Sequence, residues 1–244
     1  SSHGKNIKAP IKPAAKPAPS AKVPVSPAPA QLAPAGGKAP VCDVQVPAGG
    51  TALADALAKA TTGARLCLAT GDHKGGFAID KSVTLVGETG AVILGTKRAS
   101  ALRIDDDGLA IRLENLTLRG GNADAGGGLA IFGRGKVTIE NCTFSANKAG
   151  LVGGGGMYAR TGLLNVANST FDGNEGRQGG AVFLDQAVKS EFKRCTFTRN
   201  KAEMGGAMRA SEGVEASLRA CQFSDNVGQD GASIVIILCG GNKG

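Results

Sequence analysis

In the C-terminal half of the chain, apolar and polar positions alternate in short runs that recur at a nearly constant interval. The recurring motif is Phe-x-x-Asn, found at Phe144–Asn147, Phe171–Asn174, Phe197–Asn200 and Phe223–Asn226. Its copies are 27, 26 and 26 residues apart, and a glycine motif such as GGAV at 179–182 or GGAM at 205–208 follows the Asn. A fixed period in this range is typical of solenoids, arrays and propellers.

Strands fit the repeat better than helices, because Gly-Gly in a helix interior would cost roughly 2 kcal/mol per copy. Apolar or small residues occur seven, five and two positions before each Phe or its equivalent, with polar residues between them. These residues are Ile111, Leu113 and Leu116; Val137, Ile139 and Cys142; Leu164, Val166 and Ser169; Ser190, Phe192 and Cys195; and Ala216, Leu218 and Cys221. The spacing predicts two short strands that meet at a bend.

We therefore predict an all-β fold, a single-stranded parallel β-helix with about three short strands per turn. The Phe residues should stack in its interior. The Asn residues should form a ladder at one bend, because Asn tolerates left-handed backbone and its amide can bond its copy about 4.8 Å away. The Ala-rich segment 51–60 predicts a short amphipathic helix that caps the first turn, and residues 75–96 read as successive short strands.

Composition divides the chain into two parts. Nine of the ten prolines and six lysines lie within residues 1–40, and the first acidic residue is Asp43. Residues 1–41 are expected to form a disordered Pro/Ala/Lys-rich tether, and residues 42–244 the β-helix domain. Without these six lysines the formal net charge of +8 falls to +2, which argues against nucleic-acid binding. The lysines either contact anionic envelope polymers or keep the linker soluble.

The last apolar run, SIVIIL at 233–238, is too short to span a bilayer, so no membrane-spanning segment is expected in this chain. We expect Ile234, Ile236 and Leu238 to form an assembly edge on the last turn. This edge either packs on another copy of the chain or on a different envelope protein, or is covered by the short tail that follows it.

Two cysteines flank the predicted capping helix. Cys42 and Cys67 should lie on neighbouring strands, and we predict a disulfide between them, in agreement with export to an oxidising compartment. Cysteine and histidine spacings resemble no zinc ribbon, and His3 and His73 stand alone, so no metal site is expected from these residue types.

The remaining cysteines lie further along the chain. Cys142 is two turns from Cys195, or about 9.6 Å, which exceeds disulfide reach and predicts a buried free thiol. Cys195 and Cys221 are one turn apart; they either bridge or, as we expect, form a ladder of small apolar side chains. Cys239 has no evident partner.

One surface combines aromatic and charged residues. If the apolar residue after each glycine motif points inward, the outward positions bring Phe132, Tyr158 and Phe183 to one face. The same positions place next to them Arg160, Asp185 and Arg209. Rings flanked by Arg and Asp suit a sugar or a protein partner; alternatively, a loop or the tether covers them. Between two arginines, Asp185 should form an ion pair rather than act as an acid catalyst.

The repeats resemble two known groups of proteins. Phe-x-x-Asn paired with Gly-Gly-Ala-apolar is similar to the repeat of the polymorphic outer membrane protein family, and KGGFAIDKSVTLVGETGAVILG resembles the first turns of pectin-lyase-like right-handed β-helices. The resemblance covers about residues 45–238. It implies a right-handed helix and an exported location, but that superfamily contains adhesins, lyases, hydrolases, esterases and surface spacers.

Candidate chemistry is sparse. Asp105, Asp106 and Asp107 provide oxygen ligands that would suit Ca²⁺, as in lyases of this fold, but the Gly that follows them favours a turn. The chain also lacks the GHG and paired-Asp signatures that the resemblance would bring for a glycosidase. We therefore expect no catalytic residue, no metal site and no cofactor.

These observations predict an exported, non-catalytic β-helix of a bacterial cell envelope or surface. It would be periplasmic, outer-membrane-associated or extracellular, and would act in binding, in adhesion or as a structural component of an assembly. Its partner would be an envelope protein or a polysaccharide, with self-association through the last turn as a further possibility. The alternative is a small polysaccharide lyase or glycoside hydrolase.

Overall fold

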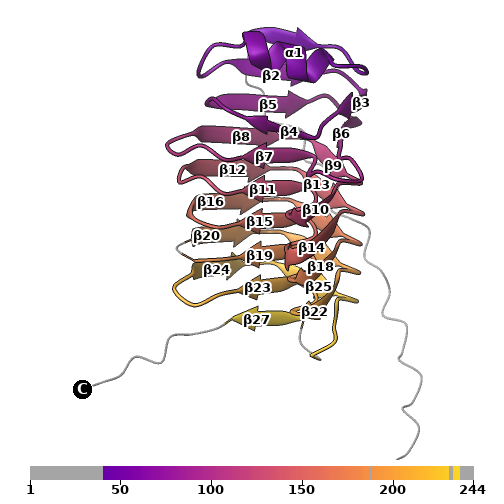
Figure 1. Ribbon diagram of the computed structural model, residues 1–244, viewed down its shortest axis with the longest axis vertical. Coiled ribbons are helices and arrows are strands. Elements are labelled where there is room, and N and C mark those ends of the chain that lie inside the picture. Colours follow the sequence, from indigo (N-terminus) through magenta and orange to yellow (C-terminus); the bar gives the residue numbers. More distant parts are fainter. Residues whose placement is uncertain (1–40, 187, 231–232, 237–244) are drawn as a thin grey trace, which may run out of the picture. The chain divides into compact units, whose positions relative to one another are not determined.

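The protein is described by a computed structural model that covers residues 41–186, 188–230 and 233–236. Its strands stack as successive turns of one parallel β-helix, and four parallel sheets run along the stack (Figure 1). We call the sheets A, B, C and D; within a turn the chain passes through A, B, D and C in that order. The predicted all-β solenoid is confirmed. The predicted tether lies outside the described residues, apart from Val41.

Each sheet takes one strand from every turn that contributes to it, stacked in chain order. Sheet A contains β1 (Val44–Val46), β2 (Arg65–Leu68), β5 (Val83–Gly87), β8 (Ala110–Glu114), β12 (Lys136–Glu140), β16 (Gly162–Ala167), β20 (Val188–Lys193) and β24 (Glu215–Arg219). Sheet B contains β3 (Gly71–Lys74), β6 (Ala91–Leu94), β9 (Thr117–Arg119), β13 (Thr143–Ser145), β17 (Thr170–Asp172), β21 (Thr196–Thr198) and β25 (Gln222–Ser224). Sheet C contains β4 (Phe77–Ile79), β7 (Leu102–Ile104), β11 (Leu129–Ile131), β15 (Met157–Ala159), β19 (Val182–Leu184), β23 (Met208–Ala210) and β27 (Ile234–Ile236). Sheet D contains β10 (Asn122–Ala125), β14 (Lys148–Gly153), β18 (Glu175–Gln178), β22 (Lys201–Met204) and β26 (Val227–Gly228).

Sheet D corrects the expectation of three strands per turn. The turns before β10 contain strands of sheets A, B and C only, whereas each later turn adds a fourth strand between sheets B and C. The segment after each Asn has mostly charged exposed positions, so its sequence pattern resembles a bend. Pairing with the turns above and below makes it a strand all the same.

The Phe residues of the repeat form the predicted interior stack. The rings of Phe144, Phe171, Phe197 and Phe223 follow one another with centroid distances of 4.8, 4.9 and 4.7 Å and nearly parallel planes. The first three are fully buried. Because Leu118 precedes Phe144 in the same register, the column of large side chains continues toward the N-terminus and fills the centre of the helix.

The Asn residues form a buried amide ladder beside this stack. Asn147 Nδ2 donates to Asn174 Oδ1 at 3.0 Å and to the carbonyl of Leu118 at 3.0 Å, and the backbone N–H of Asn147 also donates to Asn174 Oδ1. The next two turns repeat the pattern through Asn200 and Asn226. Each amide thus bonds the turn before it and the turn after it.

The expected reason for Asn at this bend was partly wrong. The left-handed residue is the one before each Asn, for example Ala146 at φ 52° and Arg199 at φ 54°. Asn occupies a left-handed position at the other bend, between sheets A and B, at Asn115, Asn141 and Asn168. The buried Asn is therefore required for its hydrogen bonds, not for its backbone conformation.

The paired glycines have two separate causes. The first of each pair adopts a positive φ, 62° at Gly179 and 65° at Gly205, which favours glycine. A side chain on the second would collide with backbone of the adjacent turn: a Cβ on Gly180 would lie on the carbonyl of Gly206. The motif allows sheet D to turn sharply into sheet C.

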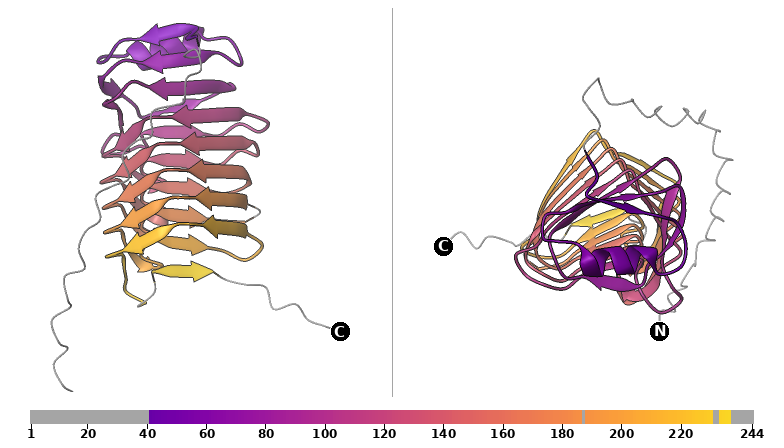
Figure 2. Two further views of the ribbon diagram at one scale, coloured as in Figure 1. Left: turned by 180° about the vertical axis from the view of Figure 1, so that it is seen from behind. Right: turned by 90° about the horizontal axis from the view of Figure 1, so that it is seen from above.

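The N-terminal end is closed as the sequence predicted. Helix α1 (Ala52–Lys59) lies across the first turn and buries Leu53 and Leu57 (Figure 2). A disulfide joins Cys42 to Cys67, the predicted pair, with their Cα atoms 5.8 Å apart. It ties the segment before β1 to β2.

The other described cysteines, Cys142, Cys195 and Cys221, are free. Burial raises the pKa of the Cys142 thiol to about 12 and that of the Cys195 thiol to about 12. Both thiols donate to backbone carbonyls at 3.4–3.6 Å. Cys142 is thus the buried free thiol that the spacing predicted, and Cys195 and Cys221, which form no disulfide, fit the ladder interpretation; Cys239 lies outside the described residues.

Removing one ring from the interior stack should strongly destabilise the fold. We expect Phe171→Ala to lower the free energy of unfolding by about 3–5 kcal/mol, because it leaves a cavity between two stacked rings. Chemical denaturation measures the loss. Thr170→Ala, whose side chain faces outward on the same strand, should cost less than about 1 kcal/mol. A loss of that small size for Phe171→Ala would contradict an interior Phe column.

Cutting the amide ladder should also be costly. Asn174→Ala removes the oxygen that accepts both the backbone N–H and the side-chain Nδ2 of Asn147. The backbone N–H of Asn147 and one of the two N–H groups of its side-chain amide then lack an acceptor, and we expect a loss of at least about 2 kcal/mol in the free energy of unfolding. The matched control is Asn165→Ala on the exposed side of sheet A. Equal losses for the two variants would show that the ladder contributes nothing specific.

Candidate binding face

The outer face of sheet C brings the predicted aromatic and charged residues together. Tyr158 on β15, Phe183 on β19 and Arg209 on β23 occupy one register position in consecutive turns. Phe132, Arg160 and Asp185 follow the ends of β11, β15 and β19. We call these six residues the sheet C cluster. The juxtaposition predicted from the repeat is present.

Two of the three rings are nevertheless covered. Tyr158 is 3% exposed and Phe183 4% exposed, because Ala125 of β10 and Val152 of β14 pack against them. Phe132 packs on the edge of this small apolar cluster and is half-buried; its ring centroid lies 5.3 Å from that of Tyr158. Of the two alternatives that the sequence left open, the covered surface therefore holds for Tyr158 and Phe183, and strands of sheet D, rather than an irregular loop, supply the cover.

Asp185 bonds to neighbours other than those expected. Its Oδ2 accepts a hydrogen bond from the Tyr158 hydroxyl at 3.1 Å, and its Oδ1 accepts one from the backbone N–H of Gln186 at 2.9 Å. Arg160 Nε donates to the side-chain oxygen of Gln186 at 3.3 Å. The arginine of the next turn, Arg209, lies over the Phe183 ring, with its guanidinium carbon Cζ 5.9 Å from the ring centroid. The predicted ion pair of Asp185 with these arginines is thus replaced by a hydrogen bond to Tyr158.

The environment of Tyr158 holds its hydroxyl in the neutral form. Burial raises the pKa of Tyr158 well above its ordinary value, and the charge of Asp185 together with the hydrogen bond to it raises that pKa further. The hydroxyl therefore donates to the carboxylate throughout the physiological pH range. The Tyr158 hydroxyl and one oxygen of Asp185 thus satisfy each other's hydrogen bond.

The acidic run at 105–107 forms a turn. Arg103 Nε contacts Asp105 Oδ1 at 2.6 Å, and Asp107 Oδ1 accepts the backbone N–H of Arg134 at 2.6 Å. Gly108 follows with φ 77°. Within the described ranges, no group of three or more His, Cys, Asp or Glu side chains is placed to hold a metal ion. Two of the three carboxylates, those of Asp105 and Asp107, thus bond neighbouring residues of the chain.

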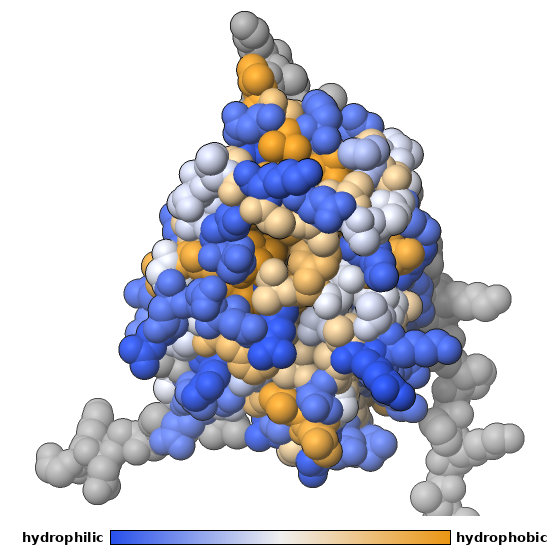
Figure 3. Space-filling model, turned by 45° about the horizontal axis from the view of Figure 1, so that its top comes forward, coloured by the Kyte–Doolittle hydropathy of each residue, from blue (hydrophilic) through white to orange (hydrophobic). Residues whose placement is uncertain are grey.

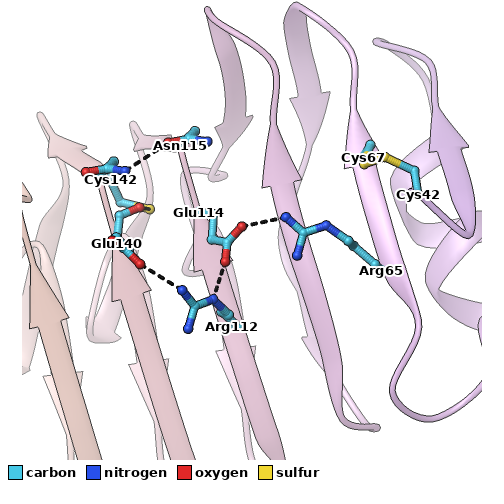
Figure 4. A network of polar contacts seen from close by, with 9 residues as sticks. Cys42, Arg65, Cys67, Arg112, Glu114, Asn115, Glu140 and Cys142 are labelled. Atoms are coloured by element: carbon cyan, nitrogen blue, oxygen red, sulfur yellow. Dashed lines mark hydrogen bonds and ion pairs between the residues drawn. A yellow bond between two sulfur atoms is a disulfide. The ribbon is translucent and has the colours of Figure 1, made fainter. Parts of the chain in front are cut away.

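A charged network on sheet A was not foreseen from the sequence. Glu114 bonds both Arg65, at 2.7 Å, and Arg112, and Arg112 bonds Glu140 at 2.7 Å (Figure 4). Burial alone would raise the pKa of Glu114, but the hydrogen bonds from both arginines outweigh it and hold this pKa below its ordinary value. Glu114 and Glu140 occupy equivalent outward positions of consecutive turns, and that alignment was the available signal. The network joins three strands of one sheet.

The predicted assembly edge is partly described. Ile234 and Ile236 lie on β27, the terminal strand of sheet C among the described residues, and Leu238 lies outside them. Phe223 and Ile234 in this last turn are half-buried, whereas their equivalents in earlier turns are buried. Whether a partner packs there stays a prediction.

Residues 87–242 match a protein-family model described as the right handed beta helix region. The chain belongs to this right-handed β-helix family. The match assigns the handedness that the sequence resemblance had implied. In this β-helix no described helix is long and apolar enough to cross a membrane.

Two solved structures similar to this β-helix contain the pectin methylesterase of Aspergillus niger. In its deglycosylated form, 13% of residues are identical, 84% of this chain and 88% of that chain are covered, and the TM-score is 0.49. The penultimately deglycosylated form gives 13% identity, 80% and 89% coverage and a TM-score of 0.45. No curated protein matches the chain. At these TM-scores the likeness carries no argument about function.

The single tyrosine of the chain allows a direct test of the Tyr158–Asp185 pair. Because the folded pKa lies above the unfolded value of about 10, the stability from this group is complete below that pH and is lost as the pH rises through the folded pKa. We expect little tyrosinate absorbance in the native protein at pH about 11, and full absorbance after unfolding in denaturant at the same pH.

Asp185→Asn serves as the matched variant for this titration. It removes the neighbouring negative charge and should lower the pH at which Tyr158 ionises in the native state. Ionisation of native wild-type protein near pH 10 would contradict a buried, carboxylate-bound tyrosine.

Proposed function

We propose that this right-handed β-helix is a non-catalytic protein exported to a bacterial cell envelope or surface. It acts there in binding or as a component of an assembly, and its ligand is an envelope protein or polysaccharide. The observation that carries the proposal is the state of Asp185, the carboxylate at the centre of the sheet C cluster. Each of its two oxygens accepts a hydrogen bond, one from the Tyr158 hydroxyl and one from the backbone N–H of Gln186.

A catalytic carboxylate needs a different setting. A nucleophilic carboxylate must have a free oxygen that faces the substrate. One oxygen of Asp185 instead accepts a hydrogen bond from a tyrosine hydroxyl that stays protonated, and the other accepts one from a backbone N–H. Asp105 and Asp107 are engaged in the same way, by Arg103 and by the N–H of Arg134. In this proposal these carboxylates stabilise the structure and have no catalytic role.

The exposed part of the sheet C cluster suits contact with a ligand. Arg160 and Gln186 are exposed, and Phe132 offers part of one ring. Arg103 lies over that ring, with its guanidinium carbon Cζ 4.9 Å from the ring centroid. Figure 3 views one side of the molecule, where hydrophobic residues lie in a hollow between hydrophilic side chains. A half-buried ring flanked by arginines is a common arrangement at protein and carbohydrate interfaces.

Export is supported by two features of the chain. The Cys42–Cys67 disulfide is of the kind that persists in oxidising compartments. The repeat itself resembles that of the polymorphic outer membrane proteins, which are surface proteins. In this proposal residues 1–41 tether the domain, and the domain needs neither a metal nor a cofactor.

The proposal predicts no turnover of envelope or plant-type glycans. Purified full-length chain, incubated with methyl-esterified pectin, polygalacturonate and neutral glycans with and without Ca²⁺, should release no methanol, new reducing ends or unsaturated products. Turnover that disappears in Asp185→Ala or Asp105→Ala would replace the proposal with the lyase or hydrolase alternative.

Binding is measured in a separate experiment with the same protein. Envelope polymers and extracts are passed over immobilised protein, and Arg160→Ala should lower retention of the ligand about tenfold or more, as expected for an interface arginine. Arg199→Ala, an exposed arginine at the bend between sheets B and D, is the matched control. Equal retention by both variants would remove the sheet C cluster from the proposed function.

A further inference from the structure

Three consecutive turns carry the acceptor motif for N-linked glycosylation at the bend between sheets A and B. The motif Asn-x-Thr begins at Asn115, Asn141 and Asn168. A glycosyltransferase can modify the asparagine of Asn-x-Ser/Thr when the middle residue is not proline. No other asparagine of the chain begins such a motif. We call these three residues the bend asparagines.

The fold places both ends of each motif at the surface. All three bend asparagines are exposed, with φ between 49° and 55°. The threonine two residues later begins a strand of sheet B, where Thr117, Thr143 and Thr170 lie in register and are half-buried, while the residue between Asn and Thr is buried. An enzyme can therefore reach the amide and the hydroxyl of the motif in the folded chain.

The conformation of the bend favours asparagine but does not require it. In the next two turns Arg194 and Ala220 occupy the same position with φ of 53° and 52°. The asparagines of the interior ladder differ, because they are buried and each amide bonds the neighbouring turns. The exposed amides of the bend asparagines thus have no comparable role in the core.

Hydrogen bonding distinguishes the middle bend asparagine from the other two. Asn141 Nδ2 donates to Asn115 Oδ1 at 3.2 Å, and Arg194 Nε donates to Asn168 Oδ1 at 2.7 Å. Within the part of the chain that the structure describes, Nδ2 of Asn115 and Nδ2 of Asn168 donate no hydrogen bond. Nδ2 is the atom that receives a sugar, so Asn115 and Asn168 offer it free.

The spacing of the turns leads to the same two residues. Adjacent turns are about 4.8 Å apart, and a pyranose ring with its hydroxyl groups is wider than that spacing. Sugars on neighbouring bend asparagines would therefore crowd each other. Asn115 and Asn168 are two turns apart, about 9.6 Å, so both can carry a sugar when Asn141 does not.

We propose that Asn115 and Asn168 are N-glycosylation sites and that Asn141 between them stays unmodified. A glycosyltransferase supplies the sugar from a donor whose C1 is bonded to a phosphate oxygen. Nδ2 of the asparagine forms a bond to C1, and the bond from C1 to that oxygen breaks with its electron pair leaving on the phosphate. The proton displaced from Nδ2 passes to a base of the enzyme. Both Oδ1 atoms can still accept their hydrogen bonds.

The inference does not depend on the role of the sheet C cluster, because it concerns the bend between sheets A and B. It agrees with export, since Asn-x-Thr acceptors on a surface bend are a feature of secreted proteins. Sugars there would add bulk and polarity along one edge of the stack.

Mass spectrometry of the full chain from the cells that make it tests the proposal. We expect sugar on the peptides that contain Asn115 and Asn168 and none on Asn141. Thr117→Val removes the hydroxyl of the motif and should abolish the sugar on Asn115 alone, whereas Thr117→Ser should retain it. Asn165→Gln, at an exposed asparagine outside any such motif, is the matched control and should leave both sugars in place.

A second experiment tests the crowding. Purified folded chain is incubated with nucleotide-linked glucose and a soluble N-glycosyltransferase that accepts Asn-x-Ser/Thr. The wild type should gain glucose at Asn115 and Asn168, and the double variant Asn115→Gln, Asn168→Gln should gain it at Asn141 instead. No sugar on the chain from its own cells, or glucose on all three bend asparagines of one wild-type molecule, would each overturn the proposal.

Discussion

The buried amide ladder fixes the relation of each turn to the next. Backbone hydrogen bonds alone would allow a parallel stack to slip by two residues, since inward and outward positions recur at that interval. The ladder removes this freedom: Asn174 must meet both Asn147 and Asn200, and its Nδ2 must reach the carbonyl of Phe144. A slipped register would leave buried amides without partners, at a cost of about 1–3 kcal/mol each.

A fixed register turns local sequence into surface columns. Once the amides align, each outward residue of the repeat has a fixed neighbour 25 to 28 positions away, and the contacts across turns follow from that register. The Tyr158–Asp185 bond and the Arg112–Glu140 pair are both products of this alignment. The register that makes the core regular therefore also fixes which side chains are neighbours on the surface.

The parts of the structure that could be predicted from the sequence are those that follow from short sequence patterns. The Phe stack and the inward slots follow from the spacing of the repeat, the closing helix from its Ala-rich amphipathic sequence, and the Cys42–Cys67 bridge from the two cysteines on either side of that helix. The burial of Tyr158 and Phe183 depends on a different kind of information, the path of β10 and β14 between sheets B and C. Most exposed positions of those strands hold polar residues or glycine, so their pattern resembles a loop until neighbouring turns supply hydrogen bonds.

The asymmetry of the two ends affects how such a molecule opens. In a linear array each turn is stabilised by its neighbours, so loss of structure spreads one turn at a time from whichever end is weaker. The first turn is covered by Leu53 and Leu57 and crosslinked by a disulfide, while Phe223 and Leu218 of the last complete turn are only half-buried. Backbone amides of β24 and β25 should therefore exchange with solvent before those of β2 and β5, and the β-helix would unzip with a defined polarity, toward the crosslinked end.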